Sequence, residues 1–90
     1  MYTKSTVVKN ATGLHARPAS DFVSAANKFG SKITIRRTGG EGAGVNAKSI
    51  VLLLSQGFCQ NEEVEITAKG DDETQAVEAL IALIDSGFGE

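Results

Sequence analysis

The sequence predicts an α+β fold, an open-faced two-layer sandwich in which helices pack on one face of a four-stranded, mostly antiparallel sheet. Residues 32–36 and 63–68 alternate apolar and polar side chains, which is typical of strands with one buried face. Residues 16–29 and 73–85 place apolar side chains three and four positions apart, which is typical of amphipathic helices. The expected order is strand, helix, strand, strand, helix, strand, helix.

Composition indicates one small soluble domain over residues 1–90. The chain is 41% hydrophobic and carries nine basic against eleven acidic residues, a net charge of −2. This balance argues against nucleic-acid binding, which needs a clustered basic face. The single cysteine, Cys59, excludes an internal disulfide, supports no zinc site and is expected to pack as a small apolar side chain. The first twenty residues do not resemble a leader and the longest apolar run is residues 50–54, so a cytoplasmic monomer without membrane insertion is expected.

The first thirty residues predict a strand, a loop and a helix. Residues 2–9 are rich in Thr and Val and predict a strand, followed by a loop over residues 10–13. The first helix is expected to begin at Ala16, with Pro18 in its first turn and Gly30 as its stop. Its apolar stripe comprises Ala16, Ala19, Phe22, Val23, Ala26 and Phe29.

The centre of the chain predicts a hairpin. Residues 38–44 hold four glycines in seven positions, which predicts a mobile hairpin loop after the strand at 32–36. Val45 and Asn46 could return as an edge strand. The glycines lack the lysine and serine spacing of a phosphate-binding loop, so an ordinary loop is the better interpretation.

Capping residues mark the last two helices. Ser49 is a suitable N-cap for a helix over residues 49–56, in which Leu53 is the best core candidate. Asp72 and Gln75 resemble a capping box at the start of a helix over residues 73–85. The acidic pairs Asp71/Asp72 and Glu62/Glu63 are interpreted as helix-start and solvated strand charges.

His15 is the only histidine and lies between a glycine-containing loop and the first helix. A helix N-terminus presents unpaired amides and partial positive charge, so the backbone N–H groups of Ala16 and Arg17 could hold an anion there, with the Arg17 guanidinium as a further donor. An unperturbed imidazole is largely neutral near pH 7 and has a ring nitrogen free to attack phosphorus. A histidine and arginine in isolation fit a surface or capping role better.

Two segments of the chain carry a more specific signal. The run GLHARPA at residues 13–19 resembles the active-site segment of HPr, the histidine-containing phosphocarrier family of the sugar phosphotransferase system. The run NAKSI at residues 46–50 resembles the regulatory-serine site of the same family. The resemblance covers the whole chain in length and element order.

The resemblance implies a carrier rather than an enzyme, with no cofactor or metal. His15 would accept a phosphoryl group on Nδ1 from enzyme I, charged by phosphoenolpyruvate, and pass it to a sugar-specific enzyme IIA domain, with Arg17 and the amides offsetting charge. Ser49 would be phosphorylated by an ATP-dependent HPr kinase/phosphorylase, slowing transfer. The implied partner-docking residues are Ser20, Ile50, Val51 and Leu54.

Two alternatives and three departures from the family pattern accompany this interpretation. A regulatory module of the same fold would dock a transcriptional regulator through the Ser49 face and carry no phosphoryl flux. A hydrolase using His15 as general base would need a nucleophile partner and a pocket, which the sequence does not offer. The chain departs from the family pattern at Leu52, where glycine is expected, at Val51 and Leu54, where methionine is more common, and in a longer loop over residues 38–44.

Overall fold

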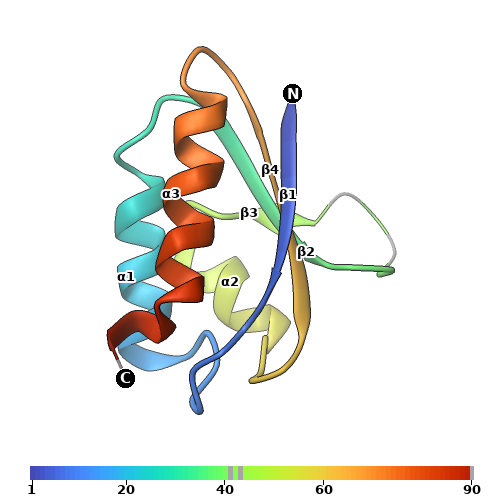
Figure 1. Ribbon diagram of the computed structural model, residues 1–90, viewed down its shortest axis with the longest axis vertical. Coiled ribbons are helices and arrows are strands. Elements are labelled where there is room, and N and C mark those ends of the chain that lie inside the picture. Colours follow the sequence, from blue (N-terminus) through green and yellow to red (C-terminus); the bar gives the residue numbers. More distant parts are fainter. Residues whose placement is uncertain (41, 43, 90) are drawn as a thin grey trace.

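Four antiparallel strands form one sheet, and α1 and α3 cover one of its faces (Figure 1). The structure is a computed structural model that describes residues 1–40, 42 and 44–89. The strands lie in the order β1-β4-β2-β3. They span β1 Tyr2–Val7, β2 Lys32–Arg37, β3 Val45–Asn46 and β4 Glu63–Lys69. The helices are α1 Ala16–Ala26, α2 Ile50–Gln56 and α3 Glu73–Asp85, followed by the 3-10 turn η1 Gly87–Gly89. The predicted fold class and element order are confirmed.

The core lies between the sheet and the helices because the fully buried residues of β2 and β4 are all apolar. In the register Ile33 is opposite Ala68 and Ile35 is opposite Ile66, and all four side chains are buried. Burying each of the three isoleucines contributes about 1.5–3 kcal/mol, so this layer holds the helices in place. The largest fully buried side chains also include Phe22 of α1, Leu53 of α2, Leu80 and Ile84 of α3, and Phe58.

The first helix is shorter than predicted. It ends at Ala26, and Asn27 is its C-cap, with the side-chain amide of Asn27 donating to the Val23 carbonyl at 2.9 Å. Lys28 and Phe29 continue in tight turns instead of helix, donating to the carbonyls of Ala25 and Ala26. The prediction that the helix reaches the stop at Gly30 was wrong, because the amides of Lys28 and Phe29 donate to the third residue before them instead of the fourth, as in a 3-10 turn.

The prediction of a mobile loop over residues 38–44 includes positions 41 and 43, which lie outside the described residues. The edge strand that follows is confirmed, because Val45 pairs with Ile35 and Asn46 pairs with Thr34. Of the helices in the described ranges, none has the length and apolar character needed to cross a membrane.

The capping box predicted at Asp72 and Gln75 was wrong. Asp72 precedes α3, but its side chain makes no capping bond to that helix. Its carboxylate instead accepts hydrogen bonds from the Gly30 amide at 2.9 Å, the Ser31 amide at 3.0 Å and the Ser31 hydroxyl. These donors stabilise the anion, led by the Ser31 hydroxyl, and hold the pKa of Asp72 below its ordinary value. Asp72 therefore ties the start of α3 to the start of β2.

We expect Asp72→Asn to destabilise the protein at about pH 7 and to lose much of that effect in acid. A carboxyl group with a lowered folded-state pKa stabilises the native state above its unfolded-state pKa, and this contribution is lost as pH falls through the folded-state pKa. Urea unfolding of both proteins at about pH 7 and about pH 2 measures the difference. Asp71→Asn, at the exposed neighbour, is the control. A difference in unfolding free energy that is the same at both pH values would contradict the role of the anion.

Glu62 and Cys59 also differ from their predicted environments. The Glu62 carboxylate accepts from the Arg37 guanidinium and from the Cys59 amide at 2.7 Å, so it is a turn-forming charge rather than a solvated one. Arg37 lies 4.8 Å above the Phe58 ring and donates to the carbonyls of Gln56 and Gly57 at the end of α2. Cys59 is exposed, not packed as a small apolar side chain, because the neighbouring Phe58 takes the buried position.

Candidate functional site

The loop before α1 is held by a backbone conformation that glycine alone adopts readily. Gly13 has φ 67°, and its amide donates to the Asn10 carbonyl at 3.1 Å while its carbonyl accepts from the Asn10 side chain at 2.8 Å. A Cβ on Gly13 would collide with the Phe58 carbonyl oxygen and lie 2.9 Å from the Cys59 Cα. Leu14 is buried and donates to that same Phe58 carbonyl at 3.0 Å. The loop is therefore seated on the segment that follows α2.

His15 is the N-cap residue of α1, but its side chain makes no capping hydrogen bond. The backbone is extended at φ −126° and ψ 163°, and the residue is half-buried. Among the described residues, no group accepts a hydrogen bond from the backbone N–H of Ala16 or Arg17. The ring therefore lies at a helix N-terminus with unsatisfied donors beside it.

Ala16 begins α1 in a strained conformation. Its φ is 50°, in the left-handed region that a residue with a Cβ rarely adopts, and such a conformation costs of order 1–3 kcal/mol. The residue is exposed, so core packing on its own side chain does not impose the strain. The conformation sets the direction in which the chain leaves His15 and enters the helix.

The Arg17 guanidinium is held beside the start of α1 by two groups from different parts of the chain. Its Nη2 donates to the Phe88 carbonyl at 3.3 Å, and its Nε lies 3.7 Å from Asp21 Oδ2. Its side chain is still 69% exposed. In Figure 1 the C-terminal turn lies next to the start of α1, as this contact requires. An anion at His15 would therefore compete with Asp21 for Arg17.

The sequence predictions did not include Asp21 or Phe88 at this site. Asp21 follows Arg17 by four residues, which is the spacing of a helical ion pair and was a usable signal. Phe88 is 71 positions from Arg17 and carries no comparable sequence signal. Ser20, predicted to dock a partner, is exposed on α1.

The second predicted segment forms a short helix with an apolar outer surface. Ser49 is its N-cap, and the Ser49 hydroxyl accepts from the Leu52 amide at 3.3 Å, which confirms the predicted capping. Leu53 is fully buried, as predicted. The exposed members are Ile50 at 38%, Val51 at 72%, Leu52 at 43% and Leu54 at 43%, which we call the α2 patch. Leu52 was not predicted to belong to it.

The α2 patch and the His15 loop belong to one region of the molecule. Helix α2 packs beside α1, and the segment after α2 holds Gly13 and Leu14 through Phe58. Exposed apolar side chains clustered on a small domain mark an interaction surface. The geometry therefore gives a histidine with adjacent anion donors and a nearby apolar surface on which another protein could dock.

Comparison with known proteins identifies the family. The family model for the PTS HPr component phosphorylation site matches residues 2–86. The chain belongs to the HPr family. It is 45% identical to the HPr-like protein Crh of Halalkalibacterium halodurans, over 94% of this chain and 98% of that protein. It is 44% identical to the phosphocarrier protein HPr of Haemophilus influenzae, over 93% of this chain and 95% of that protein.

A solved structure of the HPr family shows the same fold. The crystal structure of HPr-C-His from Thermoanaerobacter tengcongensis matches with a TM-score of 0.92 and 47% identity, over 100% of this chain and 98% of that one. The chain also matches the multiphosphoryl transfer proteins of Vibrio cholerae and Haemophilus influenzae, but it spans only 22% and 17% of their lengths. HPr-type sequences therefore occur both as small proteins and within longer ones.

Among the described residues, no group of three or more His, Cys, Asp or Glu side chains could hold a metal ion. Among the described residues, the groups of the site that could interact with an anion or a partner are the His15 ring, the Arg17 guanidinium, the amides of Ala16 and Arg17, and the α2 patch. These groups can receive and stabilise a transferred anionic group when a second protein supplies it.

Proposed function

We propose that this chain is a phosphocarrier in which His15 accepts a phosphoryl group from phosphorylated enzyme I and passes it to a sugar-specific enzyme IIA domain. The observation that carries the proposal is the position of His15 at the N-terminus of α1. Its ring makes no capping hydrogen bond, and the unsatisfied amides of Ala16 and Arg17 lie beside it. Membership of the HPr family supports it. In this role residues 1–90 work as one cytoplasmic, monomeric domain.

The transfer is a displacement at phosphorus. The Nδ1 lone pair of His15 forms a P–N bond as the bond between phosphorus and the donor nitrogen breaks, while the ring proton stays on Nε2. Charge spreads over the phosphoryl oxygens in a loose transition state, so positioning and electrostatics supply most of the catalysis. The amides of Ala16 and Arg17 and the Arg17 guanidinium are the donors available on this chain. The remaining contacts come from the partner, which makes this chain a co-substrate of phosphotransferases.

The test is phosphorylation with defined components. The purified protein is incubated with phosphoenolpyruvate, magnesium and an enzyme I, and followed by intact mass and phosphorus NMR. We expect one acid-labile phosphate on a histidine, which is then lost when an enzyme IIA domain is added. Absence of any label with several enzyme I proteins, on a folded chain, would contradict the proposal.

The α2 patch is proposed to dock these partners together with Ser20. Its apolar side chains lie on a helix too short to bury them, and the segment after α2 supports the His15 loop. An apolar centre with charged groups at the edge is typical of protein interfaces. Ser49, at the start of the same helix, is proposed as a regulatory phosphorylation site for an HPr kinase/phosphorylase.

We expect Ser49→Asp to accept phosphate from enzyme I at least about tenfold more slowly than the native protein. A charge beside the α2 patch would have to be desolvated when a partner docks, and an unpaired buried charge costs several kcal/mol, with 1.4 kcal/mol equal to a tenfold change. Initial rates of histidine phosphorylation measure the effect. Ser49→Ala is the control for loss of the cap alone. Equal rates for Ser49→Asp and Ser49→Ala would count against the mechanism.

A second candidate function is regulatory binding without phosphoryl flux. The relative at 45% identity is an HPr-like protein called Crh, and the α2 patch is exposed enough to serve such a role alone. In that case a kinase would label Ser49 with ATP, while enzyme I would leave His15 unlabelled. A transcriptional regulator would then bind the Ser49-phosphorylated form.

A further inference from the structure

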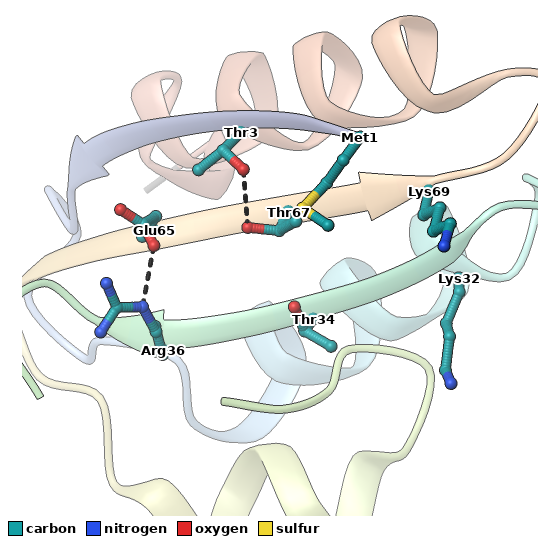
Figure 2. Close-up of a pocket in the computed structure, with 8 residues that line it drawn as sticks. All are labelled: Met1, Thr3, Lys32, Thr34, Arg36, Glu65, Thr67 and Lys69. Carbon is teal, nitrogen blue, oxygen red and sulfur yellow. Dashed lines mark hydrogen bonds and ion pairs between the residues drawn. The ribbon is translucent and has the colours of Figure 1, made fainter. Parts of the chain in front are cut away.

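The open face of the sheet, opposite α1 and α3, contains a hollow that the proposed function does not use. Its volume is about 440 Å³, and side chains of β1, β2 and β4 line it together with Met1 (Figure 2). His15 and the α2 patch do not contribute to it. The face is formed by the polar positions of the alternating strands, so its side chains take no part in the core.

One end of the hollow holds two lysines that the fold does not neutralise. Lys32 and Lys69 are directly opposite each other on antiparallel strands, an arrangement of like charges that destabilises a sheet. Within the described part of the chain, neither ammonium group forms an ion pair or a hydrogen bond. Glu73, which feels the charge of Lys69, is instead bound by the Met1 amino group at 2.8 Å. An anion between the two lysines would relieve their repulsion.

The floor of the hollow is a row of hydroxyl groups. Thr67 is in register with Thr3 on one side and with Thr34 on the other, so the three side chains cross the sheet together. The Thr3 and Thr67 hydroxyls are 2.9 Å apart, while the half-buried Thr34 hydroxyl has no partner among the described residues. Each hydroxyl can donate and accept, so the row suits a ligand with hydroxyl groups of its own.

The far end of the hollow holds an ion pair instead of two positive charges. Arg36 Nε lies 2.8 Å from Glu65 Oε1, and Figure 2 shows this pair across the threonine row from the lysines. Glu65 is four residues from Lys69, which is about 13 Å along a strand. The carboxylate would accept hydrogen bonds from hydroxyl groups and would repel a second anion. A net charge of −2 also gives the protein no long-range attraction for a polyanion.

We propose that this hollow binds a small phosphate monoester of a polyhydroxyl compound, with the phosphate between Lys32 and Lys69 and the hydroxyl groups along the threonine row toward Arg36 and Glu65. A single anionic end and a neutral hydroxylated body match the charge pattern from one end to the other. The site is separate from His15 and does not depend on the proposed phosphocarrier function.

The test is a titration followed by the amide NMR spectrum of the full chain, with glucose 6-phosphate as the probe. We expect the largest shifts at Thr34, Thr67 and the two lysines, and binding at least about tenfold weaker for inorganic phosphate or glucose alone. Lys69→Gln and Lys32→Gln should each weaken binding of the probe about tenfold. The matched control is Lys28→Gln, an exposed lysine outside the hollow, which should bind as the native protein does.

A second measurement shows that the variants remain folded. Because Lys32 and Lys69 repel each other, Lys32→Gln should raise the midpoint of thermal unfolding while it weakens binding. Shifts confined to the His15 region, or equal affinity of the native and Lys69→Gln proteins for the probe, would overturn the site. Inorganic phosphate binding as tightly as glucose 6-phosphate would overturn the assignment of the hydroxyl-binding half. None of these outcomes depends on whether enzyme I labels His15.

Discussion

His15→Ala is expected to abolish phosphate acceptance and to leave the fold intact. The chain has one histidine, so no other imidazole can form the acid-labile P–N bond. The His15 ring makes no capping hydrogen bond and is only half-buried, so its removal takes little from the packing. Intact mass and phosphorus NMR after incubation with phosphoenolpyruvate and enzyme I measure the first effect. Circular dichroism and urea unfolding measure the second.

The matched control is Ser49→Ala, which removes the other proposed phosphorylation site and keeps His15. It should still gain one acid-labile phosphate under the same conditions. Acid-labile phosphate on His15→Ala would show that another residue is the acceptor. Unfolding of that variant would show that the ring has a structural role which its burial does not indicate.

Gly13→Ala is expected to lower the free energy of unfolding by about 2–3 kcal/mol. The position has φ 67°, and a methyl group there would meet the backbone of Phe58 and Cys59, which cannot move aside as a flexible side chain could. Because the same loop leads directly into His15, the variant should also accept phosphate more slowly. Urea unfolding and initial rates of phosphorylation check the two parts separately.

Gly30→Ala, at a glycine that follows α1, is the matched control for Gly13→Ala. Gly30 does not have a positive φ, and a Cβ there would have no neighbour within 4 Å, so its free energy of unfolding should change by less than about 0.5 kcal/mol. Equal stability of the two variants would mean that the loop can shift away from Phe58. If the Gly13→Ala protein is destabilised but still accepts phosphate at the native rate, the contact of Gly13 with Phe58 stabilises the fold without positioning His15.

Much of the fold was predictable because its signals are local. The alternation in residues 32–36 and 63–68 depends on which face of a strand is buried, and the observed β2 and β4 confirm it. The cap at Ser49 needs only a hydroxyl within reach of an amide three residues on. Asp72 is also a residue type that commonly caps helices. Its carboxylate instead accepts hydrogen bonds from the amides of Gly30 and Ser31, which the packing of α3 on the sheet brings to it.

The candidate site also contains residues that local sequence predicts and contacts that it does not predict. His15, Arg17 and Ser49 were identified because they lie in two short runs with a family resemblance, and the family is confirmed. The Arg17 contact with Phe88 could not be predicted, because it joins residues 71 positions apart. Leu52 was read as a departure from the family pattern, and only its exposure beside Val51 and Leu54 placed it in the α2 patch.

Local patterns in the chain predict the element types, the buried faces of the strands and helices, and the histidine at a helix start, because hydrophobic periodicity and capping act over a few residues. Tertiary structure alone decided which groups meet: Asp72 with Gly30, Glu62 with Arg37, and Lys32 with Lys69 across the open face. Such contacts depend on strand order and register, which arise when distant segments bury a common core. The hollow on the sheet is a consequence of that register.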